Sequence, residues 1–519
     1  FNNRPNFRSC SFFLPLTTSV TQRFTVKFFL AANFTDCDLV TFWKRRNHLT
    51  DLVVDMIPPD FSYIQKILLP LFYTIQMSVT GTVLGIFFAL VLSPFGAANL
   101  GFPAVIRRIL RIVIQILRSF PALILALTAT FLFGLGTFAG TFAITLYTFA
   151  IMTKLTYEDA SAADVKAYQA LRAMGVSKYV AYIHGILPEI IPGFLTNALY
   201  LLETNVRHSS ILGYVGAGGI GLLLNEKISW LEYDKVGTIL LMLFLTVCVI
   251  EYFSRYLAAL IRKEHTIKKE QARLLLLFLA ALFLICTFTL SLPDFSKTSP
   301  QTLRNMFAGF LQPDWSFFFS AEKDGLGYLL LETVCIAFIG TVIGAIVSAP
   351  LAFLNTKRFV PAPVSFLFNL VIMIIRSVPF LVYGLIFIRV SGPGAFTGVL
   401  TLAVCSIGLL TKRFTEALDA LDPRPYHALL AMGVRPLPAI CHSVLPQLKP
   451  VFTSIILYRF DVNIREASVL GLVGAGGIGA PLIFSMNQYA WEKAGAIMLG
   501  LILLVWFIDM VSEKIGAGN

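Results

Sequence analysis

LLLLFLAALFLICTFTL, from Leu274 to Leu290, is a stretch without a single charged side chain. A bilayer-spanning helix needs about 20 mostly apolar residues, and its backbone polar groups must bond within the helix. A second apolar block runs from Ile239 to Ile250. Of the 519 residues, 57% are hydrophobic and 13% are charged, whereas soluble domains carry about 25% charged residues. The sequence therefore predicts an all-α integral membrane protein.

The net charge of +12 does not require a nucleic-acid partner. The basic residues stand in short clusters between apolar blocks, a pattern typical of cytoplasmic loops in a membrane protein. The seven cysteines are scattered and form no CxxC pair. This spacing predicts neither a disulfide framework nor a metal site.

Two copies of one pattern follow each other along the chain. Arg118-Ser119-Phe120-Pro121 recurs as Arg376-Ser377-Val378-Pro379, 258 residues later. The same offset relates further pairs, up to the glycine-rich strings: Gly134 and Gly392, Ala173–Val176 and Ala431–Val434, Leu187-Pro188 and Leu445-Pro446, Gly216–Gly221 and Gly474–Gly479. One register held over a hundred residues indicates a tandem duplication.

The expected boundary is a charged linker at 262–272, between a first module at 1–261 and a second module at 273–519. Six spans per module give about 12 transmembrane helices. In the second module the spans are expected near 273–291, 327–350, 364–388, 395–411, 449–470 and 493–513. The first module matches from about residue 68 onward. Its first 60 residues are harder to interpret, because the apolar segment Cys10–Phe34 holds Arg23 and Lys27.

Basic residues predict the orientation of the spans, because Lys and Arg concentrate in cytoplasmic loops. Under the six-span count, most loop clusters fall on one side, which we expect to be cytoplasmic. The cluster Lys44-Arg45-Arg46 falls on the other side and breaks the rule. An even number of spans gives both modules the same orientation, so a pseudo-two-fold axis along the membrane normal relates them.

The longest polar stretch shared by both modules is Thr153–Pro188, matched by Thr411–Pro446. Asp164 and Asp422 are expected to cap a short helix that ends at Gly175 and Gly433, where glycine can adopt the left-handed conformation. Its apolar stripe fits two interpretations: a helix lying on the protein's own surface, or a docking helix for a cytoplasmic partner. Duplication on one face favours docking by a two-fold partner.

These loops resemble the EAA loop of binding-protein-dependent ABC importer permeases of the type I, MetI-like fold, from about residue 68 to residue 513. The resemblance implies a cytoplasmic ABC ATPase dimer that uses ATP and Mg, and an extracytoplasmic substrate-binding protein. The sequence departs from the motif at Asp159 and Leu418. The residues that this resemblance assigns to ATPase coupling are Glu158, Asp159, Ala160, Asp164, Gly175, Leu187 and Pro188, with Glu416, Ala417, Asp422, Gly433, Leu445 and Pro446.

A second motif, N-x-R-x-x-S-x-L-G-x-V-G-A-G-G-I-G, begins at Asn205 and again at Asn463. It is similar to permeases of phosphonate importers, whose relatives handle phosphite or phosphate-like anions. The resemblance implies a bacterial inner-membrane permease for such anions. The residues expected along the substrate path or gate are Asn205, Arg207, Ser210, Gly218 and Gly219, with Asn463, Arg465, Ser468, Gly476 and Gly477.

Arg207 and Arg465 stand in apolar sequence, where a charge is costly unless it faces a cavity or a partner. A guanidinium fork suits a phosphonate group. The alternative is that each arginine pairs with a nearby acid (Glu203, Asp461 or Glu466) or reaches the membrane interface. Reaching the interface is the stronger expectation for Arg118 and Arg376, near span ends. The difference between His208 and Glu466 at twin positions has no assigned meaning.

The string Gly216–Gly221 matches GxGxxG but lacks the surrounding βαβ pattern that a dinucleotide site requires. We expect a tightly packed, non-helical segment near the extracytoplasmic gate instead. No Walker sequence GxxxxGK[ST] occurs in the chain, so we expect a transport subunit without a cofactor of its own rather than an enzyme. Alternatives are a permease for another solute such as methionine, an ion-coupled secondary transporter, and an intramembrane enzyme, which lacks a matching catalytic set.

Overall fold

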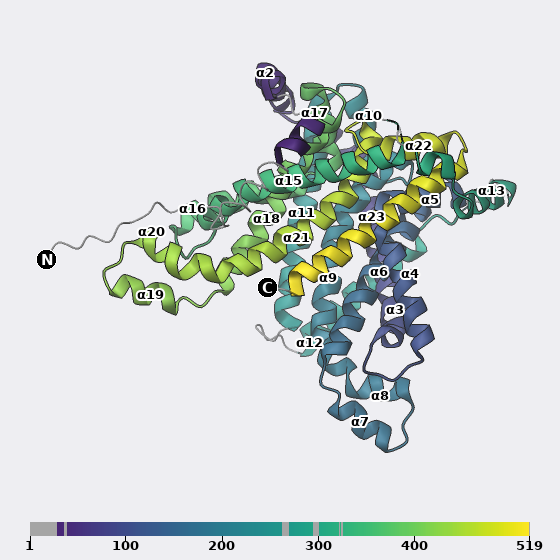
Figure 1. Cartoon of the computed structure of the whole chain (residues 1–519), viewed down its shortest axis with the longest axis vertical. Coiled ribbons are helices and arrows are strands. Elements are labelled where there is room, and N and C mark those ends of the chain that lie inside the picture. Colours follow the sequence, from purple (N-terminus) through teal and green to yellow (C-terminus); the bar gives the residue numbers. More distant parts are fainter. Residues whose placement is uncertain are drawn as a thin grey trace.

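The computed structural model describes residues 28–35, 39–261, 269–293, 300–320, 322 and 325–517. These residues form helices and connecting turns, without a strand (Figure 1). Most of the segment Cys10–Phe34 and of the predicted linker 262–272 lies outside the described residues.

The helices from α3 to α11 form module 1, and those from α15 to α23 form module 2. Module 1 comprises α3 (Ile64–Gly96), α4 (Ala104–Ser119), α5 (Ala122–Phe133), α6 (Thr137–Ala162), α7 (Lys166–Ala173), α8 (Lys178–Gly185), α9 (Leu187–Leu212), α10 (Ile220–Ser229) and α11 (Tyr233–Ile261). Module 2 comprises α15 (Leu326–Asn355), α16 (Ala362–Ser377), α17 (Phe380–Ser391), α18 (Ala395–Ala420), α19 (Arg424–Ala431), α20 (Pro436–Ala439), α21 (Leu445–Leu470), α22 (Gly479–Asn487) and α23 (Trp491–Ala517). The helices that precede the modules are α2 (Leu39–Asp55), α12 (Lys269–Phe288), α13 (Pro300–Leu311) and α14 (Trp315–Phe318).

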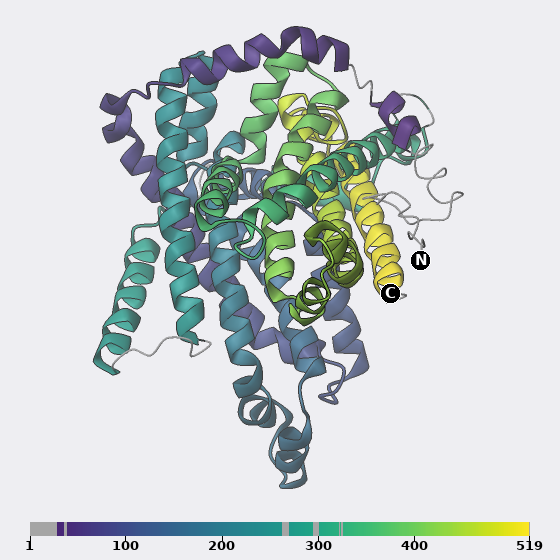
Figure 2. The same ribbon diagram turned by 90° about the vertical axis from the view of Figure 1, so that its left-hand side faces the viewer.

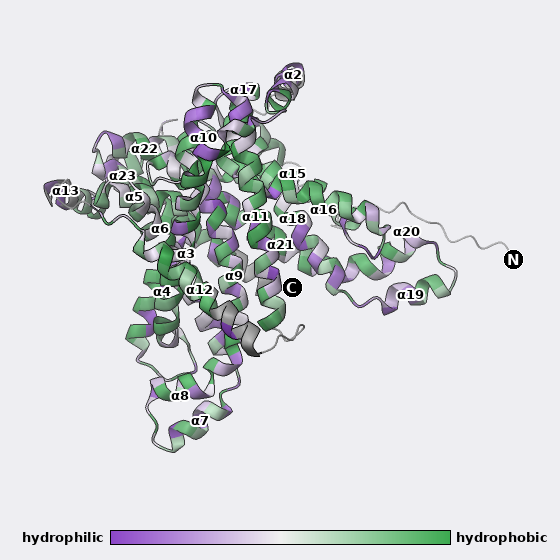
Figure 3. Ribbon diagram, turned by 180° about the vertical axis from the view of Figure 1, so that it is seen from behind, coloured by the Kyte–Doolittle hydropathy of each residue, from purple (hydrophilic) through white to green (hydrophobic). Residues whose placement is uncertain are grey.

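Seven helices in the described part of the chain are long and apolar enough to cross a membrane, or up to ten if each bent pair counts as one span. Figure 3 shows hydrophobic residues along these long helices. Ten spans are five per module, and α12 covers most of 273–291, the first of the six spans expected for the second module. The corresponding segment of the first copy falls largely outside the described residues.

The predicted span 364–388 differs from a single helix. The chain bends by 87° between α16 and α17, and by 95° between the twin helices α4 and α5. Both bends fall at the repeated proline motif, where Phe120 and Val378 are extended, with ψ of 129° and 125°. A proline lacks the N–H needed to continue a helix and pushes the preceding residue out of the helical region. The repeated proline therefore explains the break.

The two modules interlock through the helices that precede them. The α12 helix precedes module 2 but packs against α3 of module 1, where Gln76 Nε2 donates to the Cys286 carbonyl (3.0 Å) and to Thr289 Oγ1 (2.8 Å). The α2 helix precedes module 1 but packs mainly against α17 of module 2, and Figure 2 shows it lying across the ends of the long helices. Val382 of α17 belongs to the same buried cluster as Ile67 and Ile228 of module 1. Each module is thus partly covered by a helix next to the other in sequence.

Small residues bring the long helices close together. A Cβ placed on Gly81 of α3 would lie 2.8 Å from Ile144 of α6, and one on the twin Gly340 of α15 would lie 2.7 Å from Leu402 of α18. Such close contacts are typical of membrane helices, whose association depends on direct packing rather than on apolar burial. These twins are 259 residues apart, so α3 and α15 are shifted by one residue relative to the repeat downstream.

Candidate functional site

Two short helical hairpins project from the bundle. One is formed by α7 and α8, the other by α19 and α20, and both lie on the side that holds the C-terminal end of α23 (Figure 1). The α10 and α22 helices lie toward the opposite side. The predicted coupling loops therefore form matching projections rather than helices lying flat on the bundle.

The first helices of the hairpins begin and end close to the predicted residues. Asp164 Oδ1 accepts a hydrogen bond from the Lys166 N–H, and Asp422 Oδ1 accepts one from the Arg424 N–H, each at 3.0 Å. This bond lowers the pKa of the Asp164 carboxyl because it stabilises the charged form. The helices end at Ala173 and Ala431, and the C-cap residues Met174 and Met432 are followed by glycines with a positive φ: Gly175 at +84° and Gly433 at +80°. The left-handed glycines are confirmed, whereas the N-cap positions are Val165 and Pro423, one residue after the predicted caps Asp164 and Asp422.

The hairpins expose one face and anchor the other. Met174 and Met432 are each 77% exposed. On the inner side, Tyr168 is buried and donates a hydrogen bond to the Leu100 carbonyl (2.6 Å), while its twin Tyr426 packs edge-on against Phe359. An exposed methionine is a flexible, polarisable surface for a partner. The hairpins are thus held by an aromatic residue and present an apolar tip.

The remaining coupling residues lie at the roots of the hairpins. Glu158 is 3.6 Å from Lys154, and Glu416 is 3.1 Å from Arg413. Asp159 is exposed, Ala160 is buried, and Ala417 is partly buried. Leu187-Pro188 and Leu445-Pro446 begin the long helices α9 and α21. These residues join each projection to a membrane-crossing helix.

Asn205 and Asn463 are both fully buried between helices. Asn205 Nδ2 donates to Thr82 Oγ1 and Thr148 Oγ1, each at 2.7 Å. Asn463 Nδ2 makes the twin bonds, to Thr341 Oγ1 (2.7 Å) and Ser406 Oγ (2.9 Å). Ser210 and Ser468 bond the carbonyls of Arg207 and Arg465 in their own helices. These bonds join the helices through the amide donors, whereas the Oδ1 atoms of both asparagines are buried without a partner among the described residues.

Arg207 and Arg465 each pair with an acid one helical turn earlier. Arg207 is 3.0 Å from Glu203, and Arg465 is 2.5 Å from Asp461. In this structure each arginine therefore pairs with a nearby acid, which was one of the two predicted alternatives. One guanidinium nitrogen of Arg207 is buried without a hydrogen-bond partner among the described residues, so the pair leaves a donor unused.

The glycine strings form tight, non-helical turns, as predicted. Gly218 and Gly219 have φ near +77° and +78°, and their twins Gly476 and Gly477 near +79° and +77°. A Cβ on Gly219 would come within 2.8 Å of Met77 and Thr74. Only glycine fits both the conformation and the space. The position of these turns at a gate stays a prediction.

The prediction for Arg376 was wrong, because this residue does not reach the membrane interface. Its side chain is 6% exposed and crosses between modules, 3.0 Å from Glu203 and 3.3 Å from Glu251. Lys412 adds a further contact to Glu251 at 3.0 Å. The twin Arg118 also crosses between modules, to Asp509, at 3.8 Å with 17% exposure. We call these two ion-pair sites the Arg376 joint and the Arg118 joint.

The difference between His208 and Glu466 has a structural cause. Glu466 lies 2.8 Å from Arg459, whose side chain is 4% exposed. The residue of module 1 at the position of Arg459 is Leu201, which needs no anion. There His208 packs edge-on against Tyr147 instead, with ring centroids 5.1 Å apart. The charge of Glu466 therefore belongs to a pair that module 1 lacks.

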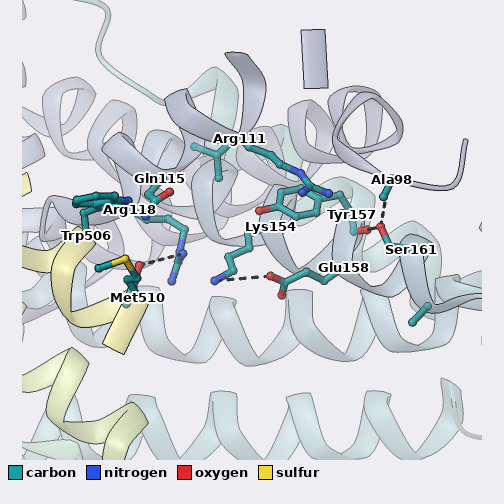
Figure 4. Close-up of a pocket in the computed structure, with 13 residues that line it drawn as sticks. Ala98, Arg111, Gln115, Arg118, Lys154, Tyr157, Glu158, Ser161, Trp506 and Met510 are labelled. Carbon is teal, nitrogen blue, oxygen red and sulfur yellow. Dashed lines mark hydrogen bonds and ion pairs between the residues drawn. The ribbon is translucent and has the colours of Figure 1, made fainter. Parts of the chain in front are cut away.

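A pocket of about 560 Å³ lies beside the Arg118 joint, between α4 and α6 of module 1 and α23 of module 2 (Figure 4). Arg111, Arg118 and Lys154 contribute positive charges to its wall, and Glu158 and Asp509 negative ones. No group of three His, Cys, Asp or Glu side chains suited to a metal ion occurs within the described part of the chain.

The sequence defines the class of protein that this duplicated bundle and its hairpins belong to. Residues 64–263 and 340–515 match the family of binding-protein-dependent transport system inner membrane components, and the chain belongs to this family. It is a multi-pass inner-membrane transport permease.

Individual relatives sharpen this placement. The chain is 27% identical to the Phosphate-import permease protein PhnE of Mycolicibacterium smegmatis, over 90% of this chain and 88% of the relative. It is 36% identical to the Phosphite transport system permease protein PtxC of Stutzerimonas stutzeri, over 35% of this chain and 67% of the relative. The Probable D-methionine transport system permease protein MetI of Vibrio cholerae is more distant, at 24% identity over 38% of this chain and 93% of the relative.

Proposed function

We propose that the chain forms the whole membrane path of an ATP-driven importer for phosphonate or a related phosphorus oxyanion. The observation that carries this proposal is the pair of projecting hairpins with matching Asp hydrogen bonds, left-handed glycines and exposed methionines. Two equal surfaces on one face suit a partner that is itself two-fold. The names of the phosphate and phosphite permeases among the relatives support the substrate class.

In this proposal, a cytoplasmic ATPase dimer docks on the two hairpins and hydrolyses ATP with Mg. Each hairpin joins α6 to α9, or α18 to α21, so its displacement moves two membrane-crossing helices. The ion-pair joints link the modules directly, and rocking of one module against the other would change them. Alternating exposure of the path requires such a change between two packed states. A binding protein delivers the anion from the outer side.

Residues near the junction of the modules suit an anionic substrate. Arg207 and Arg465 are partly buried twins, and each guanidinium pairs with one carboxylate here. A phosphorus oxyanion could exchange with Glu203 or Asp461, because a guanidinium binds either group with the same fork of donors. We propose that these arginines contact substrate only in a state where the pairs open.

The experiment that tests the function is uptake in a bacterial host that lacks its own phosphorus-anion importers. The full chain is expressed together with an ABC ATPase and a substrate-binding protein from the same source organism. We expect ATP-dependent uptake of labelled phosphate or phosphite that methylphosphonate or phosphite inhibits. Methionine uptake by the complex, or uptake by the chain alone under an ion gradient, would overturn the proposal.

A further inference from the structure

The pocket beside the Arg118 joint has more positive charge than its acids neutralise. Three cationic side chains line it, Arg111, Arg118 and Lys154, against the two carboxylates of Glu158 and Asp509. In Figure 4 the ends of Arg118 and Lys154 point into the same space. Arg111 is held at the edge, because it donates two hydrogen bonds to the Gly96 carbonyl, at 3.0 and 2.9 Å. The other two cations are therefore the ones available to a ligand.

Both available cations make only long contacts. Arg118 lies 3.8 Å from Asp509, and Lys154 lies 3.6 Å from Glu158, which is itself half exposed. Hydrogen bonds from charged nitrogen to carboxylate oxygen are normally about 2.7–2.9 Å long. Among the described residues, neither side chain donates a hydrogen bond at such a distance. Their N–H groups point into the pocket with donor capacity to spare.

At the Arg376 joint, the twin cations have carboxylates at shorter distances. There the twin arginine has two carboxylates, Glu203 and Glu251, and the twin lysine Lys412 lies 3.0 Å from Glu251. Glu203 contacts both Arg207 and Arg376, whereas its twin Asp461 pairs with Arg465 at 2.5 Å and forms no ion pair with Arg118 among the described residues. Arg118 thus lacks the second anion that Arg376 has.

The pocket lies next to a helix with a lipid-facing side. The α4 helix exposes a row of branched apolar side chains while Arg111 and Arg118 face the pocket: Val105, Ile106, Ile109, Ile112, Val113 and Ile116. Trp506, 48% exposed, stands in the wall of the pocket. Exposed Trp beside apolar residues is typical of the membrane–water boundary. The pocket also includes Ser161 and Ala162, directly before the α7–α8 hairpin.

We infer that this pocket is a binding site for an anion with a phosphate group, held by Arg118 and Lys154. A guanidinium and an ammonium together match the several oxygens of a phosphate. The volume of about 560 Å³ falls within the range of about 300–1,000 Å³ found for small-molecule sites. The phosphate belongs either to an anionic lipid headgroup or to a soluble phosphate. A bound anion would join α4 and α6 to α23 across the module boundary.

This binding requires neither transport nor a particular substrate, so it is tested by binding alone. The full chain is purified in detergent and given two probes: phosphatidylglycerol, followed by native mass spectrometry, and inorganic phosphate, followed by calorimetric titration. Phosphatidylcholine, which carries no net charge, is the comparison lipid. The variants are Arg118→Gln/Lys154→Gln and, as a control, Arg108→Gln. Arg108 is an exposed arginine on the same helix that does not line the pocket.

We expect the wild type and Arg108→Gln to bind at least one probe equally well, and the double variant to bind it roughly tenfold to a hundredfold more weakly, the size of one or two charge-assisted hydrogen bonds. Arg118→Lys, which keeps the charge but loses the fork, should bind with intermediate affinity. Retention of phosphatidylglycerol alone identifies a lipid site, and binding of inorganic phosphate identifies a soluble ligand. Failure of the wild type to bind either probe, or equal binding by the double variant, overturns the inference.

Discussion

The two joints between the modules contain twin residues but form different contacts. In the Arg376 joint, an almost fully buried arginine is held by two carboxylates at 3.0 and 3.3 Å. In the Arg118 joint, the twin arginine has one carboxylate at 3.8 Å and a pocket beside it. The twin positions of Glu203 and Glu251 are also acids, the shorter Asp461 and Asp509, but only Asp509 contacts Arg118. One boundary of the molecule is closed by its own side chains, whereas the other has room for a ligand.

The largest expected effect concerns the hairpins, where the modules are most alike. Gly175→Val or Gly433→Val should abolish uptake, because a branched residue at these positive φ angles distorts the end of the docking helix. The local strain of about 1–2 kcal/mol should leave membrane insertion intact. Uptake and membrane content are measured together.

A matched control is Gly327→Val, in α15, where the added side chain also meets open space but φ is helical. It should transport like the wild type. Normal uptake in both hairpin variants would contradict a docking role. A loss in only one variant would show that the hairpins are not equivalent.

The joints should differ in their contribution to stability. Arg376→Gln leaves Glu203 and Glu251 buried with less compensating charge, which costs about 3–5 kcal/mol. Arg118→Gln removes one long, partly exposed contact and should cost about 1 kcal/mol or less. Thermal unfolding of the purified chain in detergent measures both. Equal losses would remove the distinction between a closed and an open joint.

A smaller effect is expected where the modules differ in sequence. Glu466→Gln leaves the guanidinium of Arg459 buried without its carboxylate and should cost about 3 kcal/mol, at the low end for a broken buried pair. His208→Gln should cost less than about 1 kcal/mol, since no ion pair is lost. The double variant Arg459→Leu/Glu466→His copies module 1. It should regain most of the stability, and no recovery in unfolding experiments would refute the pairing as the reason for the difference.

The smallest effect concerns pH and the turn between α10 and α11, where Lys227 and Glu232 have the uncharged twins Ser485 and Ala490 in module 2. Lys227 and Lys235 each lie 2.9 Å from Glu232 and lower its pKa. A carboxyl with a lowered pKa stabilises the fold above its unfolded pKa, about 4.3 for Glu, and loses this contribution as the pH falls through the lowered value. Glu232→Gln should therefore lower Tm slightly at pH 7, and the difference should be smaller at pH 3. An equal difference at both pH values would exclude the ion pairs as its cause.

Local signals in the sequence were sufficient for much of the architecture. Apolar length predicted the helices, and Asp164 and Gly175 marked the ends of α7 to within two residues, because helix ends and left-handed glycine depend on a few adjacent residues. The bend at Val378-Pro379 was missed, although the proline was a usable signal against a continuous span 364–388. The pairing of Arg376 with Glu251 had no such signal. The two residues are 125 positions apart, and only the packing of α11 against α16 brings them together.

The interlocked helices set an order on assembly. During synthesis, α2 leaves the ribosome about 325 residues before α17, the helix on which it rests. At about 5–20 residues per second, that delay is roughly 15–65 s. The surface of α17 that contacts α2 is therefore synthesised late. The surface of α3 that contacts α12 stays uncovered until α12 has been synthesised. Until then, module 1 lies in the bilayer without its contacts to module 2. A ribosome stall within module 2 would leave module 1 in that incomplete state.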